Sequence, residues 1–374
     1  MAKASNVVGN NVLSVSVSDI VQTVKLGFKL KHAVFIHGAP GIGKSDIIRQ
    51  IGKEDNRPVF DIRLALMNPV DLRGIPMVVN GETQWMAPEF FKNSENAILF
   101  FDEFPAAPPA VQAAAYQIVL DRQIGEFKLP DSCDIVAAGN RTEDKGLNYK
   151  IAPALRNRFV HLNVEPDINA WKDWALGNGI HQDILGYLNF NQGMLFRFDN
   201  GHNTGNFPTP RSWARLSEAV TLMESDKGFS GLSNNIAILS GYIGQGAAME
   251  FNAFRKVAAT IPNAKDVIEN GNYKVRVDTD KPDLVCAFCA ALVNLAINNK
   301  STKDKAGKTQ PEGLEAAGNL MRYLTHKPFG GEYITMVARD FFRSPRGKSM
   351  VVHFVNPNSA WKDVAAEINK LISQ

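Results

Sequence analysis

Ten residues near the start of the chain, HGAPGIGKSD (37–46), combine three glycines with one lysine and one hydroxyl. They lie between an apolar run, AVFI, and a helix-like segment, and they contain the pattern G-x-x-x-x-G-K-[ST]. Glycines let backbone N–H groups turn inward around a phosphate, and the helix N-terminus adds the positive end of its dipole. We therefore predict a loop that binds the phosphates of a nucleotide, made of Gly38, Ala39, Pro40, Gly41, Ile42, Gly43, Lys44, Ser45 and Asp46.

The pattern also assigns separate tasks to two side chains of this loop. Lys44 is expected to reach the β- and γ-phosphates, and Ser45 to place its hydroxyl on Mg²⁺. An acidic pair, Asp102 and Glu103, ends the apolar run AILFF about 60 residues further on. Such a pair is often only a solvated strand end. After a phosphate loop it predicts that Asp102 holds Mg²⁺ through its water shell and that Glu103 polarises the water that attacks ATP.

Polar side chains later in the chain extend this candidate site. Asn140 ends the next strand-like run, DIVAAGN, and is either a turn residue or an amide that orients the same water. Arg156 and Arg158 precede the following run and are either surface arginines or an arginine finger given to a neighbouring subunit, with Arg158 favoured. Arg211, in FPTPRSWARL, falls in the first turn of a helix and could close onto the same nucleotide.

The elements that must position these residues alternate in type between 32 and 164. Runs that are apolar on both faces, separated by helices, predict a parallel α/β sheet covered on both sides. Asn80-Gly81 in VVNGETQW predicts one inserted hairpin, and RQIGEFKLP around Gly125 predicts another. The expected strands are HAVFIHG, RPVFDIRLAL, AILFFDEF, DIVAAGN and FVHLNVE, and the expected helices are SDIIRQIGKE and PPAVQAAAYQIVLDRQ.

The character of the sequence changes near Asp167, after which helical patterns dominate. We expect a nucleotide-binding core over 1–166 and a smaller helical lid over 167–300. The remainder, 301–374, is expected to be an exposed loop followed by a short α+β segment of unknown role, because 298–313 is polar and rich in Lys, Gly and Pro.

Composition limits the class of protein further. The chain has 374 residues, 45% of them hydrophobic and 21% charged, with a formal net charge of +3, as in ordinary soluble proteins. We find neither an apolar run long enough to span a membrane nor a signal-peptide pattern, and we expect a cytoplasmic protein. Cys286 and Cys289 form C-x-x-C without a second pair of ligands, so we expect them to be core residues.

Taken in order, these motifs are similar to those of AAA+ ATPases. They correspond to Walker A, Walker B with its acidic pair, a sensor-1 asparagine, paired arginines and a sensor-2 arginine. FDEFPAAPPAVQAAAYQIVLDRQIG resembles the MoxR branch, and DIRLALMNPVDLRGIP, AAGNRTEDKG and FPTPRSWARL resemble a MoxR-like group of bacteria and their phages. The resemblance covers roughly 15–220. Arg141 follows Asn140 where many members of this branch have proline.

This resemblance implies a P-loop NTPase sheet of five strands in the order 5-1-4-3-2 and a hexameric ring with ATP and Mg²⁺ between subunits. It also implies chaperone-like remodelling of a protein partner, commonly one of von Willebrand factor A type, in the cytoplasm of a bacterium or of a phage-infected bacterium. The two hairpins would face the centre of the ring or the partner.

Two other functions are compatible with the sequence. A nucleic-acid motor or loader is suggested by the basic stretches RSPRGKS and KLGFKLKH and by Trp85, although a solvated loop is the more common explanation of such charges. A scaffold that binds ATP without turnover is the other, and Glu103, Asn140 and Arg158 argue against it. The sequence leaves open whether Arg63 and Arg73 face a neighbour or form surface ion pairs. His37 is expected to be structural rather than catalytic.

Overall fold

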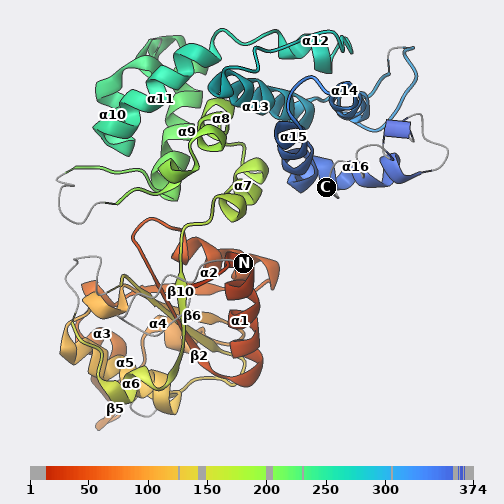
Figure 1. Ribbon diagram of the computed structural model, residues 1–374. Helices are drawn as coiled ribbons and strands as arrows, with labels where there is room; N and C mark the ends of the chain where they lie inside the picture. The colour runs from red at the N-terminus through yellow and green to blue at the C-terminus, as the bar shows by residue number, and fades with distance from the viewer. Residues whose placement is uncertain are drawn as a thin grey trace. The chain divides into compact units, whose positions relative to one another are not determined.

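The computed structural model describes residues 14–124, 127–141, 149–198, 205–229, 231–304 and 306–356, and also Trp361, Asp363, Val364 and Ala366. Contacts divide the chain into two compact units, Met1–Asp167 and Ile168–Gln374, which we call unit 1 and unit 2. Each unit is described by itself (Figure 1).

Unit 1 is built on a parallel sheet in the order β1-β10-β2-β9-β6-β3. Without the two-residue edge strand β1, this is the expected order 5-1-4-3-2, which is therefore confirmed. The strands are β1 (Ser14–Val15), β2 (Ala33–Gly38), β3 (Val59–Arg63), β6 (Ile98–Asp102), β9 (Asp134–Gly139) and β10 (Phe159–Val164).

Helices cover both faces of this sheet (red to yellow in Figure 1). Side chains alternate along each strand, so Val34 and Ile36 of β2 pack with α1 and α2, whereas Phe35 packs on the opposite face with α5. The helices of unit 1 are α1 (Val17–Leu30), α2 (Lys44–Glu54), α3 (Pro69–Arg73), α4 (Glu89–Lys92), α5 (Pro109–Asp121) and α6 (Pro153–Arg156), with 3-10 turns at Leu64–Leu66 and Phe104–Ala106.

Both expected insertions contain paired strands. β4 (Ile75–Val79) pairs antiparallel with β5 (Glu82–Met86) through Asn80 and Gly81, whose φ angles are 54° and 83°. These positive angles suit a two-residue hairpin turn, so the first hairpin is confirmed. β7 (Gln123–Ile124) pairs antiparallel with β8 (Phe127–Lys128), while the Gly125 turn between them lies outside the described residues.

Unit 2 is helical and has one continuous apolar core. Its helices are α7 (Ile168–Gly177), α8 (Gln182–Phe190), α9 (Pro210–Ser225), α10 (Ile236–Ile243), α11 (Gln245–Ala258), α12 (Ala264–Ile268), α13 (Pro282–Asn298), α14 (Leu314–Thr325), α15 (Gly331–Arg343) and α16 (Pro345–Val355). Short 3-10 turns lie at Gln192–Leu195, Lys227–Phe229 and Leu232–Asn234. Cys286 and Cys289 are buried in α13, as expected.

The expected short strand near the C-terminus is wrong, because α16 forms there instead. Ser344 caps the helix by accepting a hydrogen bond from the Gly347 N–H at 3.0 Å. Gly347, Met350 and Phe354 are buried at helical spacing, while Val351 and Val352 are exposed. Within the described part of unit 2, β pairing is limited to one bridge between Lys303 and Thr309.

Apolar side chains of α14, α15 and α16, together with Phe329, Trp361 and Val364, pack into the same apolar core as α7 to α13. The described helices of both units are too short or too polar to span a membrane.

Candidate functional site

The predicted site residues of unit 1 follow strands that end at the same edge of the sheet. Because β2, β9 and β6 are parallel neighbours, their carboxyl ends meet. Gly38 opens the predicted phosphate loop at the end of β2, Asp102 ends β6, and Asn140 follows β9. Parallel pairing thus brings together residues that are about 40 to 100 positions apart in the sequence.

The phosphate loop depends on its glycines for conformation and space. Gly41 and Gly43 have φ angles of 78° and 94°, in the left-handed region that favours glycine. A Cβ on Gly38 would lie 2.4 Å from Ile42 Cδ1. Gly43 precedes α2 and offers no capping side chain to the first N–H groups of that helix. The loop therefore presents backbone donors at a positively polarised helix end.

Lys44 lies at the centre of the site and is only 8% exposed. Its ammonium donates to the carbonyl oxygens of Gly38 at 2.7 Å and Ala39 at 3.0 Å. It also donates to Oδ1 of Asn140 at 3.1 Å. The structure thus joins the phosphate loop to the tip of β9 through one buried cation.

A second contact joins the loop to β6. The Ser45 hydroxyl donates to Asp102 Oδ2 at 2.8 Å, and the backbone N–H of Glu103 donates to the other carboxylate oxygen at 2.9 Å. Glu103 itself has a φ of 55°, uncommon for a residue with a side chain, and it is exposed. A strained backbone at the end of a strand is typical of functional positions.

The predicted arginines lie on the turn before β10, which we call the arginine turn (residues 152–158). It contains α6, and both Arg156 and Arg158 are exposed. Arg211 is also exposed, at the second position of α9, whose start is fixed by reciprocal hydrogen bonds between Thr209 and Ser212. Since α9 belongs to unit 2, the assignment of Arg211 to the nucleotide stays a prediction.

Of the two arginines left open, Arg63 is the last residue of β3 and pairs in register with Asp102. Arg73 ends α3. Both are exposed, so either of their two interpretations remains compatible with the structure.

Two histidines connect the phosphate loop to the arginine turn. His37 Nε2 lies 2.8 Å from His161 Nδ1, and His161 Nε2 lies 2.8 Å from the carbonyl oxygen of Arg156. Burial, followed by the field of His161 and of nearby cations, lowers the pKa of His37 to about 3. Burial also lowers the pKa of His161.

His37 was expected to be structural because a helix dipole would disfavour its protonated form. Burial is instead the largest cause of its lowered pKa. His161 was not among the site residues predicted from the sequence. The signal available was its position two residues after Phe159 in a strand, which places both side chains on one face.

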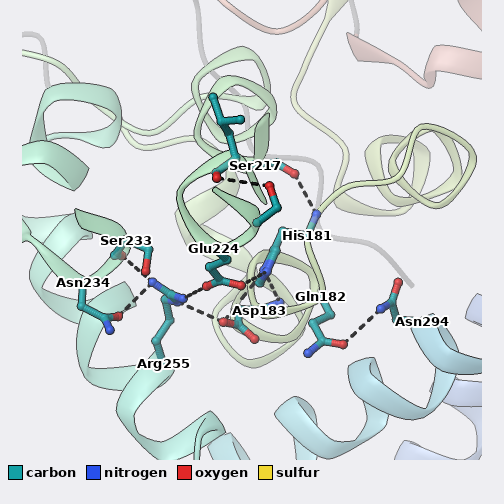
Figure 2. A network of polar contacts seen from close by, with 11 residues as sticks. His181, Gln182, Asp183, Ser217, Glu224, Ser233, Asn234, Arg255 and Asn294 are labelled. Carbon is teal, nitrogen blue, oxygen red and sulfur yellow. Dashed lines mark hydrogen bonds and ion pairs between the residues drawn. The ribbon is translucent and has the colours of Figure 1, made fainter. Parts of the chain in front are cut away.

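Unit 2 holds a separate polar cluster, shown in Figure 2. His181, Asp183 and Glu224 could together offer three metal ligands. However, the guanidinium of Arg255 forms ion pairs with Asp183, at 3.0 Å, and with Glu224. His181 Nδ1 accepts the Asp183 N–H at 3.2 Å, and its Nε2 faces Glu224 at 3.1 Å. These groups satisfy one another, so we assign the cluster a structural role that joins α8, α9 and α11.

Comparison with known families gives one clear match. Residues 33–159, from the first residue of β2 to the first residue of β10, match the family model of the AAA domain, dynein-related subfamily. This segment is similar to an AAA domain. Its sheet and flanking helices have the P-loop NTPase fold, as expected from the sequence.

Solved structures with related folds are distant from this chain. NtrX from Brucella abortus is 16% identical, with 70% of this chain and 65% of that chain covered and a TM-score of 0.38. The RuvB Holliday junction branch migration motor from Thermotoga maritima is 15% identical, with coverage of 84% and 94% and a TM-score of 0.36. A further NtrX structure, in complex with ADP, is 14% identical, with coverage of 95% and 68% and a TM-score of 0.33. No curated protein matches the chain.

Proposed function

We propose that this protein is a Mg²⁺-dependent ATPase that hydrolyses ATP to ADP and phosphate. The observation that carries the proposal is the meeting of three strand ends through two hydrogen bonds, Lys44 to Asn140 and Ser45 to Asp102. A lysine, a hydroxyl, a carboxylate and an amide in one place are the groups that phosphoryl transfer to water requires.

The residues of the AAA domain would divide the work of binding and hydrolysis between them. The backbone N–H groups of the loop and the Lys44 ammonium bind and orient the phosphates. Glu103 accepts a proton from the attacking water, and Asn140 holds that water in line.

Ser45 and Asp102 fit a magnesium site, because their oxygen atoms lie 2.8 Å apart and Mg²⁺ prefers oxygen ligands. Bound Mg²⁺ would neutralise charge on the phosphate oxygens during transfer. Arg158, with Arg156 beside it, would complete the site of a neighbouring subunit by stabilising the charge that develops on the transferred group. Arg211 would approach the same nucleotide from the lid.

The direct test replaces Glu103 with Gln, which keeps the size of the side chain and removes its basic group. We expect phosphate release to fall about 100-fold or more, within the range for loss of a general base, while binding of ATP is retained. Glu95→Gln is the matched control, since Glu95 is an exposed carboxylate elsewhere in unit 1. An unchanged rate in the Glu103 variant would remove this residue from the mechanism.

We further propose that the ATPase belongs to the MoxR-like branch and acts as a ring, most consistent with a hexamer, that remodels a protein partner of von Willebrand factor A type or similar. The hairpin β4–β5 supports a protein partner, because it exposes a set of apolar side chains that water does not favour: Ile75, Met77, Val78, Trp85 and Met86. Capture with the Glu103→Gln variant, with and without Val78→Asp, tests whether this hairpin contacts the partner.

A nucleic-acid partner remains the competing proposal and makes a different prediction. Neutralising several phosphates would make binding of a DNA or RNA oligonucleotide fall steeply between about 50 and 200 mM salt. Tight binding with such a steep slope would overturn the proposal of a protein partner but leave the ATPase chemistry in place.

A further inference from the structure

The contacts between His37 and His161 have a defined direction. A carbonyl oxygen can only accept a hydrogen bond, so the Nε2 of His161 must carry a proton and donate it to the Arg156 carbonyl. In the neutral ring, Nδ1 of His161 is then an acceptor, and Nε2 of His37 donates to it. The hydrogen bonds thus run one way, from His37 through His161 to the backbone of the arginine turn.

This connection joins the phosphate loop, which is proposed to bind ATP, to the turn that carries the proposed arginine finger. His37 directly precedes Gly38, whose carbonyl accepts a hydrogen bond from the Lys44 ammonium. Arg156 lies two residues before Arg158. A displacement of the phosphate loop can therefore be transmitted through these hydrogen bonds to the turn that carries both exposed arginines.

The histidines are held in place by aromatic packing on one face of the sheet. Phe35 stacks on His37, with ring centroids 4.2 Å apart, and meets Phe159 edge to face at 5.3 Å. Phe104, the residue after Glu103, contacts both phenylalanines with ring centroids 5.8 Å away. Because all these rings are packed against one another, the histidines have little freedom to rotate away from their partners.

Charge around the pair favours the neutral rings that the directed hydrogen bonds require. Lys44, Arg141 and Arg156 all disfavour a proton on His37, and burial adds to their effect. A second proton on His161 Nδ1 would also remove the acceptor that His37 needs.

We propose that His161, with His37, is a positioning residue that couples the phosphate loop of one subunit to the arginine turn that the same subunit offers to its neighbour. The inference rests on the proposed ATPase and on the arginines acting between subunits. It adds a physical connection between two consecutive sites of the assembly.

Three substitutions of His161 separate its two hydrogen bonds. Gln places an amide nitrogen near the position of Nε2 and keeps the donor to Arg156, whereas Asn places its amide near Nδ1 and loses that donor. Phe keeps the ring and loses both bonds. Gln, in turn, loses the acceptor for His37. Because the proposed coupling needs both hydrogen bonds, we expect kcat to fall about five- to tenfold for His161→Asn and for His161→Gln, each of which loses one bond, and at least as much for His161→Phe. A kcat within about twofold of the wild type in His161→Gln would show that the bond from His37 is not needed.

Binding of a fluorescent ATP analogue and the melting temperature are measured on the same variants. A positioning role predicts an unchanged Kd and a fall confined to kcat. A wild-type kcat for any one of the three variants would overturn the coupling through His161. So would a loss of activity in the Asn and Phe variants that merely follows their melting temperature.

Mixed assemblies test the direction of the coupling. A His161→Phe subunit keeps its own Lys44 and Glu103, so a Glu103→Gln neighbour, with an intact arginine turn, should restore hydrolysis at its site. We expect the mixture to exceed the summed activity of its parts, as should a mixture of Arg158→Ala with Glu103→Gln. Recovery with Arg158→Ala but not with His161→Phe would overturn the coupling to the arginine turn. If neither mixture recovers, arginine action between subunits fails instead, and the kcat values of the three single variants still decide the role of His161.

Discussion

His37 shows how strongly burial acts on one side chain beside the phosphate loop. Its pKa is lowered from 6.5 to about 3 in the folded protein, first by burial and then by the charges that face it, those of His161, Arg156, Lys44 and Arg141. The unfolded chain therefore takes up a proton at this residue before the folded protein does as pH falls. The contribution of neutral His37 to the free energy of unfolding is fully present above about pH 6.5 and is lost progressively as the pH falls towards 3.

We predict that His37→Gln reduces this loss of stability. Between pH 7 and pH 5 the contribution of one such group is at most about 1.4 kcal/mol per pH unit. The variant should begin less stable at pH 7, because it loses the stacking on Phe35, but its unfolding free energy should fall less on acidification. Calorimetry measures the unfolding free energy of unit 1. Its unfolding transition is identified as the one that shifts to higher temperature when nucleotide is added.

His32→Gln, at an exposed histidine of unit 1, is the control variant and is measured in the same way. Identical slopes for the His37 variant and the wild type would contradict the assignment of acid sensitivity to His37.

The site residues differ in how far the sequence alone could predict them. Lys44, Ser45 and Asp102 could be predicted because they belong to motifs with a characteristic spacing. In the structure, Lys44 donates a hydrogen bond to Asn140 and Ser45 donates one to Asp102. His161 is not readable, since its partners are 124 residues away in His37 and at a backbone carbonyl, neither of which leaves a local pattern. The contact between the two histidines arises from the pairing of β2 with β10, so it can be found only when the register of these strands is known.

At the scale of elements, the parallel strands of unit 1 were predictable because runs apolar on both faces have few alternatives. RPVFDIRLAL was expected as one strand, but β3 ends at Arg63 and a 3-10 turn comes directly after it. A short strand was expected near the C-terminus, where the structure has the helix α16. Its cap at Ser344 and the buried spacing of Gly347, Met350 and Phe354 decide the helix instead.

This helix leads to a prediction for Gly347. A Cβ there would lie 1.9 Å from the carbonyl oxygen of Phe341 and 2.8 Å from the Cα of Phe342, both backbone atoms that cannot rotate away. We expect Gly347→Ala to destabilise unit 2 by about 2 kcal/mol, within the range for overpacking. Thermal unfolding of the full chain measures the shift.

Gly331, at the first position of α15, is the matched glycine. A Cβ there meets nothing within 4 Å, so Gly331→Ala should be neutral or slightly stabilising. Equal destabilisation by both substitutions would argue against the close approach of α16 to the end of α15.

At the scale of the whole molecule, the sequence predicted the P-loop α/β fold of unit 1 and the helical character of unit 2, because a phosphate loop and helical periodicity are local signals. It did not predict that α14, α15 and α16 pack into the same core as α7 to α13. Polar residues 298–313 suggested a boundary, yet apolar side chains on both sides of this loop bury one another. A polar composition shows only that a loop is exposed. Exposed loops connect elements within one domain as well as separate domains.

The last prediction concerns assembly, since a site that takes Arg158 from a neighbour is incomplete in one chain. With Mg²⁺ and ATP, the Glu103→Gln variant should sediment as a ring, at about six times the 41.1 kDa chain mass for a hexamer. Turnover per chain of the wild type should fall on dilution as the ring dissociates, because each lost neighbour removes an arginine. Arg158→Ala should keep the assembled mass while losing about 1,000-fold in kcat, the lower end of the range for an arginine finger. A monomer that retains full turnover at every concentration would show that each chain completes its own site, and both the ring and the role of the arginine turn would have to be abandoned.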